Sequence, residues 1–192
     1  MIKVEKLFSY SSELIQGLKL IYPEVFYDKR GFFLESWNQR TFNTKIDPCN
    51  KFLQDNHSCS SKGTLRGLHY QLPPYEQGKL VRCIHGEIFD VAIDLRRSSN
   101  TFGKWASVYL SAANFKQLFI PAGFAHGFLT LSDKAEVLYK ATNYWNKDAE
   151  RSIIWNDSFL KIDWPLNIEF QLSNKDALAP SFKDLSEDDL FD

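Results

Sequence analysis

Two side chains suited to acid–base and anion-binding chemistry stand close together in GTLRGLHYQ, residues 63–71. A histidine can exchange a proton near neutral pH, and an arginine can hold a phosphate. If this stretch is a β-strand, strict alternation puts Arg66 and His69 on opposite faces. Gly67 lies between them, and a glycine inside a strand often marks a bulge, which breaks the alternation. We therefore predict a bulge at Gly67 that turns both side chains inward.

Two further candidates lie in other strand-like stretches. His126 follows the Pro-Gly turn signal of PAGFAHGF and opens the next strand. A single histidine on a strand is more often a structural residue than a catalyst. Tyr139 shares a predicted strand face with Val137 and Ala141, so a half-buried tyrosine bonded to the backbone is as good an interpretation as catalysis.

The remaining polar residues form no recognisable metal or cofactor motif. Lys79 and Arg82 of GKLVRC would ordinarily be interpreted as charges on an edge strand. A metal site needs three or four nitrogen or oxygen ligands grouped in space, whereas HYQLPPYEQGK offers only His69 and Glu76. The chain also lacks the phosphate-loop, dinucleotide-binding and esterase-elbow motifs,. We therefore expect neither a metal nor a cofactor.

The composition of the 192-residue chain indicates a folded, β-rich protein. Lys and Arg total 23 against 24 Asp and Glu, which leaves no basic field for binding nucleic acid. Aromatic residues make up 15% of the chain, as is typical of packed sheets. Three cysteines without close spacing predict reduced thiols,. With no leader or membrane-spanning pattern, we expect a soluble cytoplasmic protein.

The elements that must position these residues are short strands. Residues 78–96 contain two strand-like runs around His85 and Gly86 and predict a β-hairpin,. Further short stretches rich in β-branched and aromatic residues follow, separated by turn signals. Helical signals are confined to residues 36–46 and the acidic tail SEDDLFD. We predict a single all-β domain over residues 1–192, a jelly-roll barrel whose C-terminal segment packs back over it.

Seven longer motifs identify a family resemblance that covers roughly residues 20–180. In chain order they are DKRGFFLESWNQRTF, FLQDNHS, LRGLHYQ, GKLVRCIHGEIFDVAIDLRRSSNTFGKW, PAGFAHGFLTLS, EVLYKATNYW and WNDSFLKIDWPL. They closely resemble the dTDP-4-dehydrorhamnose 3,5-epimerases. The resemblance implies a cupin-like jelly roll (double-stranded β-helix), metal-independent and homodimeric, that makes the rhamnose precursor of bacterial surface polysaccharide.

The resemblance also assigns roles to residues. It implies that His69 is the catalytic base, that Asp176 orients it, that Tyr139 is the acid on the other side of the sugar, and that Lys79 lies at the sugar end. Arg66 would hold the diphosphate. The N-terminal strands would be exchanged between subunits, so that part of the nucleotide site comes from the partner. The further substrate-binding residues implied are Phe26, Arg30, Glu35, Gln54, Asn56, His126, Tyr144 and Glu150.

The chemistry of a 4-keto-6-deoxyhexose suits these residue types. The C4 carbonyl acidifies the protons on C3 and C5, so inversion needs a base on one face and an acid on the other. A carboxylate-held histidine and a tyrosine meet that need, and Lys79 is the candidate to stabilise the enolate oxygen.

Three alternatives stay open at this point. The first keeps the chemistry but changes the substrate, to a GDP-linked 4-keto-6-deoxyheptose or another 4-keto nucleotide sugar, or inverts one carbon only. The second is a non-catalytic jelly roll that binds a sugar nucleotide. The third is a metal-dependent cupin oxygenase, which the missing ligands disfavour.

Overall fold

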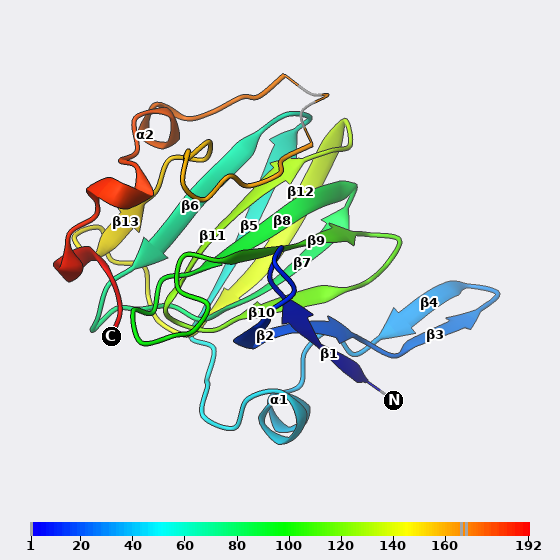
Figure 1. Ribbon diagram of the computed structural model, residues 1–192. Coiled ribbons are helices and arrows are strands. Elements are labelled where there is room, and N and C mark those ends of the chain that lie inside the picture. The colour runs from blue at the N-terminus through cyan, green and yellow to red at the C-terminus, as the bar shows by residue number, and fades with distance from the viewer. Residues whose placement is uncertain (1, 166, 168) are drawn as a thin grey trace.

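Two antiparallel β-sheets face each other and form most of the molecule (Figure 1). The computed structural model describes residues 2–165, 167 and 169–192. The larger sheet has the order β1 (Lys3–Phe8), β2 (Leu14–Tyr22), β10 (Gln117–Ile120), β7 (Lys79–His85), β12 (Lys134–Ala141) and β5 (Gln54–Ser61). The smaller has the order β13 (Glu150–Ser152), β6 (Leu65–Gln71), β11 (Phe124–Thr130), β8 (Glu87–Asp94) and β9 (Trp105–Ser111).

The order of strands β5 to β12 confirms the predicted all-β jelly roll. Four of them run β5-β12-β7-β10 in one sheet and the other four run β6-β11-β8-β9 in the other. Successive strands therefore switch sheets, except β8 and β9, which pair with each other in the smaller sheet, as expected for the double Greek key of a jelly roll. The interior between the sheets is filled by buried aliphatic and aromatic side chains from both, including Val81, Leu110, Leu118, Phe128 and Val137.

The predicted hairpin around Gly86 is wrong in its pairing, although both of its strands exist. β7 pairs with β10 and β12, whereas β8 pairs with β11 and β9. Gly86 has a φ of 72°, and a Cβ there would lie 2.1 Å from the carbonyl oxygen of Lys134. The chain turns at this glycine from one sheet into the other. Alternation identifies a strand, but the partner of that strand depends on distant residues.

Helices are short, as the sequence indicates. α1 (Gln39–Lys45) lies within the predicted region, and Asn38 caps it by accepting a hydrogen bond from the backbone of Thr41,. A 3₁₀ turn at Glu187–Asp189 lies in the acidic tail, another spans Phe182–Asp184, and α2 (Asn174–Ala177) is a single turn. No helix among the described residues is long and apolar enough to cross a membrane.

The C-terminal segment packs back over the barrel, as predicted. Trp164, Phe182 and Phe191 are buried against the outer face of the smaller sheet and form a second apolar cluster with residues such as Leu65. In Figure 1 this segment carries α2 alongside β6. The C-terminal third of the chain can therefore supply side chains to the barrel opening.

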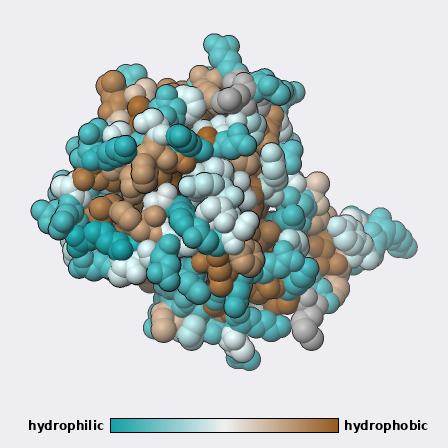
Figure 2. All heavy atoms as spheres, viewed as in Figure 1, coloured by the Kyte–Doolittle hydropathy of each residue, from teal (hydrophilic) through white to brown (hydrophobic). Residues whose placement is uncertain are grey.

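A two-stranded hairpin projects from the opposite side of the molecule (Figure 1). It consists of β3 (Val25–Asp28) and β4 (Gly31–Leu34). Figure 2 shows hydrophilic residues at its tip and hydrophobic residues nearer its base. Phe26 and Phe33 face each other across the two strands and are 54% and 71% exposed. An exposed apolar pair of this kind commonly marks a binding surface.

Candidate active site

A cavity of about 490 Å³ lies at the open end of the barrel, between the two sheets and the C-terminal segment. Strands of both sheets contribute to it, and so does α2. It brings together six of the residues singled out from the sequence, which lie up to 110 positions apart in the chain. These are Arg66, His69, Lys79, His126, Tyr139 and Asp176.

The bulge predicted at Gly67 is present and explains why Arg66 and His69 share the cavity. His69 pairs with His126 and Arg66 pairs with Phe128, so three steps on β6 match two on β11. Gly67 has a φ of 120°, and a Cβ there would lie 2.6 Å from the Cα of Gly127. Only glycine fits this close approach of two backbones. The extra residue shifts the alternation and turns both side chains to one side.

His69 and Asp176 form a dyad across 107 positions of sequence. The Nε2 atom of His69 lies 2.5 Å from Oδ1 of Asp176, whose side chain is buried. Burial opposes the charge of this carboxyl, but the hydrogen bonds with His69 and Ser173 lower the pKa of Asp176. A carboxylate accepting from Nε2–H leaves Nδ1 of His69 as the nitrogen able to take a proton.

Lys79 is buried, and its strand lies inside the sheet rather than at an edge. β7 runs between β10 and β12, so the interpretation of Lys79 as an edge-strand charge is wrong. Its Nζ donates to the backbone carbonyl of His69 at 3.3 Å. Burial lowers the pKa of Lys79 to about 8, although the charges of Asp90 and Glu150 act in the opposite direction.

His126, which lines the same cavity, forms a second histidine–carboxylate pair. Nε2 of His126 lies 3.0 Å from both carboxyl oxygens of Asp90, which is fully buried on the neighbouring β8. Asp90 was missed at the sequence level. Nothing in the neighbouring sequence distinguishes this aspartate from the other residues of its alternating strand. Only the pairing of His126 with Ala92 brings β8, and so Asp90, beside His126.

Tyr139 projects into the cavity from β12, opposite Asn56 of β5. It packs against the interior cluster that contains Val137, as its predicted strand face requires. Within the described part of the chain, nothing hydrogen-bonds its hydroxyl, which is therefore open to a ligand. Burial raises the pKa of Tyr139, with a further rise from Glu150 and an opposing effect of Arg66. The phenol is protonated at neutral pH.

Four further predicted residues do not line the cavity itself but lie near its opening, with Asn56 opposite Tyr139 and Glu150 beside Lys175. Gln54 donates to Asn56 Oδ1 at 3.0 Å and accepts from the backbone of Trp145. Tyr144 is 61% exposed there. Glu150 pairs at 2.5 Å with Lys175.

Lys175 lines the cavity beside Asp176 but was missed from the sequence. Its position next to Asp176 in SNKDA was the only signal available. As a half-exposed cation at the opening, it can contact an anionic group of a ligand.

Three predicted substrate-binding residues do not reach the cavity of their own chain. Phe26 and Arg30 lie on the projecting hairpin, where Arg30 pairs at 2.5 Å with Asp28. Glu35 follows that hairpin and accepts a hydrogen bond from Asn38. They could contact the same ligand as His69 only if another subunit supplied them.

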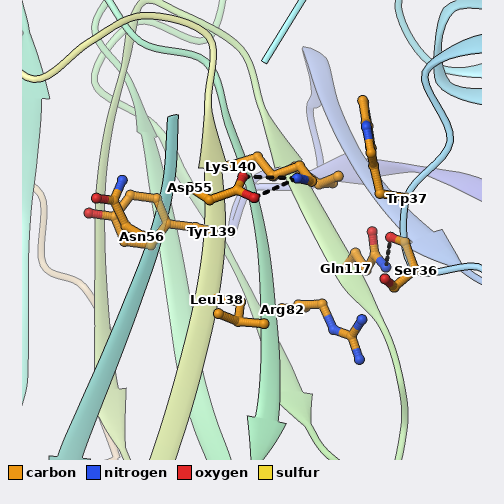
Figure 3. Close-up of a pocket in the computed structure, with 10 residues that line it drawn as sticks. Ser36, Trp37, Asp55, Asn56, Arg82, Gln117, Leu138, Tyr139 and Lys140 are labelled. Carbon is orange, nitrogen blue, oxygen red and sulfur yellow. Dashed lines mark hydrogen bonds and ion pairs between the residues drawn. The ribbon is translucent and has the colours of Figure 1, made fainter. Parts of the chain in front are cut away.

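A smaller groove, of about 190 Å³, lies on the outer face of the larger sheet. Figure 3 shows that Asn56 and Tyr139 project to one side of β5 and β12, while Asp55 and Lys140 project to the other. Asp55 and Lys140 pair at 2.8 Å. Arg82 also lines this groove; burial lowers its pKa, and none of the described residues pairs with its guanidinium. This face lies on the other side of the sheet from the cavity that contains His69.

Comparisons of sequence place the chain among nucleotide-sugar epimerases. The family model described as dTDP-4-dehydrorhamnose 3,5-epimerase matches residues 12–184. A dTDP-4-dehydrorhamnose 3,5-epimerase of Shigella flexneri is 55% identical over 170 residues, which cover 88% of this chain and 93% of that protein.

Solved structures are similar over nearly the whole fold. The dTDP-6-deoxy-D-glucose-3,5-epimerase of Legionella pneumophila, in complex with dTDP-4-keto-L-rhamnose, has a TM-score of 0.91 and 44% identity, with 98% of each chain covered. The dTDP-4-dehydrorhamnose 3,5-epimerase of Bacillus anthracis, with TDP and PPi bound, has a TM-score of 0.83 and 40% identity; 93% of this chain and 99% of that chain are covered.

Proposed function

The chain belongs to the dTDP-4-dehydrorhamnose 3,5-epimerase family, and we propose that it converts dTDP-4-dehydro-6-deoxy-D-glucose to dTDP-4-dehydro-L-rhamnose. It is thus an isomerase acting on a nucleotide sugar. The observation that carries the proposed mechanism is the meeting of the His69–Asp176 dyad, the unpaired Tyr139 hydroxyl and the buried Lys79 in one cavity. Proton removal and return next to a ketone needs these groups and no redox step.

His69 acts as the base in this proposal. Nδ1 takes a proton from C3 or C5 of the sugar while Nε2–H stays bonded to Asp176. The lowered pKa of Asp176, held against its burial by the bonds from His69 and Ser173, keeps the carboxylate charged. That charge stabilises the imidazolium that forms and fixes the ring orientation.

Tyr139 returns a proton on the other side of the sugar, where the enolate carbon is basic enough to accept one. Lys79 stabilises the enolate oxygen, because a positive charge in a buried site acts far more strongly than in water. With a pKa of about 8, set by burial against the charges of Asp90 and Glu150, most of this lysine is protonated at neutral pH. His126, held by Asp90, completes the wall beside it.

We propose that Arg66 binds the diphosphate and that the nucleotide lies at the opening of the cavity. Arg66 lines the same cavity, and its charge and planar fork suit a diphosphate,. Gln54, Asn56, Tyr144 and Glu150 are the proposed contacts at the opening. The nucleobase is the part of the substrate for which the structure offers the fewest contacts, because Tyr144 is largely exposed in the isolated chain.

A homodimer is part of the proposal. Phe26 and Phe33 form an exposed apolar face on the projecting hairpin, whereas Tyr27 and Phe32 on its other face contact Phe115 of the same chain. Exchange of the hairpins would cover the exposed pair and bring Arg30 to the partner's cavity. Light scattering should show a dimer, and an active monomer would contradict the exchange.

We also propose that the enzyme works in the cytoplasm. Cys49, Cys59 and Cys83 are all unpaired, which fits a reducing compartment,.

Proton NMR in deuterated water tests the reaction directly. We expect dTDP-4-keto-6-deoxyglucose to lose its C3 and C5 proton signals on addition of the enzyme, with no nicotinamide present. Exchange at C3 alone would replace the proposal with a single-site epimerase. No exchange here, together with exchange on a GDP-linked 4-keto sugar, would keep the mechanism and change the substrate.

A further inference from the structure

The backbone alone does not set the direction of the Arg66 guanidinium. Arg66 directly precedes the bulge at Gly67 and is exposed at the cavity opening. A long flexible side chain at such a place loses considerable rotamer freedom when it is held for a ligand. Something outside β6 must therefore hold the guanidinium if it is preorganised.

Two acceptors on β5 hold it. Nε of Arg66 donates to Oγ of Ser60 at 2.9 Å, and Nη2 donates to the backbone carbonyl of Cys59 at 3.4 Å. The shorter bond has good hydrogen-bond length, and the longer one is weak. Ser60 is only 5% exposed, so its hydroxyl is a fixed point rather than a mobile surface group.

This contact joins the two sheets at the cavity. β5 is the edge strand of the larger sheet and β6 belongs to the smaller one. No ladder pairs them among the described strands, and a short turn after Ser61 connects them. The Arg66–Ser60 bond therefore ties neighbouring strands together where no backbone hydrogen bonds of a ladder do so.

The bond leaves most of the guanidinium free for an anion. Arginine has five N–H donors, of which the contacts with Ser60 and Cys59 occupy two,. No other described residue accepts from Arg66. Because Nε is engaged, the Nη edge is the part left to face a ligand, and a diphosphate can accept two bonds there.

We propose that Ser60 is a positioning residue, which fixes the Arg66 guanidinium in the orientation that binds the diphosphate of the substrate. This inference rests on the proposed function of Arg66. Ser60 itself is not among the residues that line the cavity, so we expect it to act through Arg66 rather than by direct contact with the substrate. Its role is to remove, before binding, the rotamer freedom that Arg66 would otherwise lose.

A double-mutant cycle with dTDP as the probe tests the coupling. Calorimetry would compare the wild type, Ser60→Ala, Arg66→Ala and the double variant. We expect Ser60→Ala alone to weaken dTDP binding by about 3- to 10-fold, the range for the net contribution of an ordinary hydrogen bond. In the Arg66→Ala background the same substitution should have no further effect, because its partner is already gone.

Two further variants serve as controls for the Ser60 hydroxyl. Ser60→Thr retains the hydroxyl and should restore most of the affinity. Ser61→Ala removes the adjacent serine hydroxyl, which is exposed and bonds Thr64 and Gln171 instead; it should leave dTDP affinity as in the wild type. Thermal unfolding of each variant would separate loss of fold from loss of binding.

The outcomes distinguish this inference from the proposed reaction. Equal weakening by Ser60→Ala with and without Arg66 would overturn it, as would no weakening at all. If Arg66→Ala itself left dTDP binding unchanged, the diphosphate assignment and this inference would both fall. If the cycle shows coupling but no sugar proton exchanges, the inference stands and the reaction is the part that fails.

Discussion

At the scale of single residues, catalysis depends on proton transfers that only a few side chains can perform. His69→Ala removes the base but none of the proposed diphosphate contacts. We expect kcat to fall by about 10²- to 10⁴-fold with little change in dTDP affinity. Arg66→Ala should show the reverse, with a raised KM and a smaller effect on kcat. Steady-state kinetics and calorimetry check both, and turnover near that of the wild type by His69→Ala would remove the base assignment.

If Lys79 stabilises the enolate as proposed, the reaction should be sensitive to alkaline pH. Burial lowers its pKa to about 8 from the ordinary 10.5, against the opposing effect of Asp90 and Glu150. Below that pKa the ammonium is charged and stabilises the enolate; above it the group is neutral. The kcat should therefore fall as pH rises through about 8, by up to tenfold per pH unit.

Lys79→Arg is the matched variant for this pH effect. A guanidinium keeps its charge well above the pKa of a lysine. We expect a lower kcat overall, since the geometry differs, but no fall in kcat with rising pH near 8. An unchanged alkaline limb in the variant would show that another group is responsible.

At the scale of an element, the cavity depends on one irregularity of β6. In Gly67→Ala the new Cβ would meet the Cα of Gly127 at 2.6 Å, at a φ of 120°. Backbone strain of this kind costs about 1–3 kcal/mol, and the contact between two backbones adds to it. We expect a clearly lower melting temperature and loss of activity, because Arg66 and His69 no longer share a side.

Gly31 provides the control for this substitution. It has a similar φ of 134°, but a Cβ there meets nothing within 4 Å. Gly31→Ala therefore carries the backbone strain without the contact, and should lower the melting temperature less. Equal loss in the two variants would show that crowding against β11 is not what requires glycine at Gly67.

At the scale of the whole molecule, the exchange of hairpins can be tested by complementation. Arg30→Ala and His69→Ala should each be impaired when pure. If Arg30 acts in the partner's cavity, a heterodimer of the two variants has one site with both residues intact. Random mixing of equal amounts, with exchange of subunits, should restore about a quarter of wild-type activity, since half the dimers are mixed and each has one good site. No recovery, with mixed dimers confirmed by mass spectrometry, would place Arg30 in its own subunit's site or outside it.

Local patterns in the sequence were sufficient for several features of this molecule. Alternation and turn signals predicted the short strands and the jelly roll, and the glycine between Arg66 and His69 predicted the bulge. The family resemblance named six of the residues that line the cavity. These features depend on residues near one another in the chain, whose backbone preferences act locally.

Tertiary structure alone decided the features that join distant segments. The pair of His126 with Asp90 and the burial of Lys79 inside the larger sheet depend on which strands become neighbours. The dyad of His69 with Asp176 also joins distant segments, and at the sequence level only the family resemblance implied it. The hairpin predicted at Gly86 was wrong for the same reason, because the pairing of its two strands depends on distant residues. Strand pairing is chosen by the burial of apolar surface over the whole domain, so an alternating pattern identifies the faces of a strand but not what lies against them.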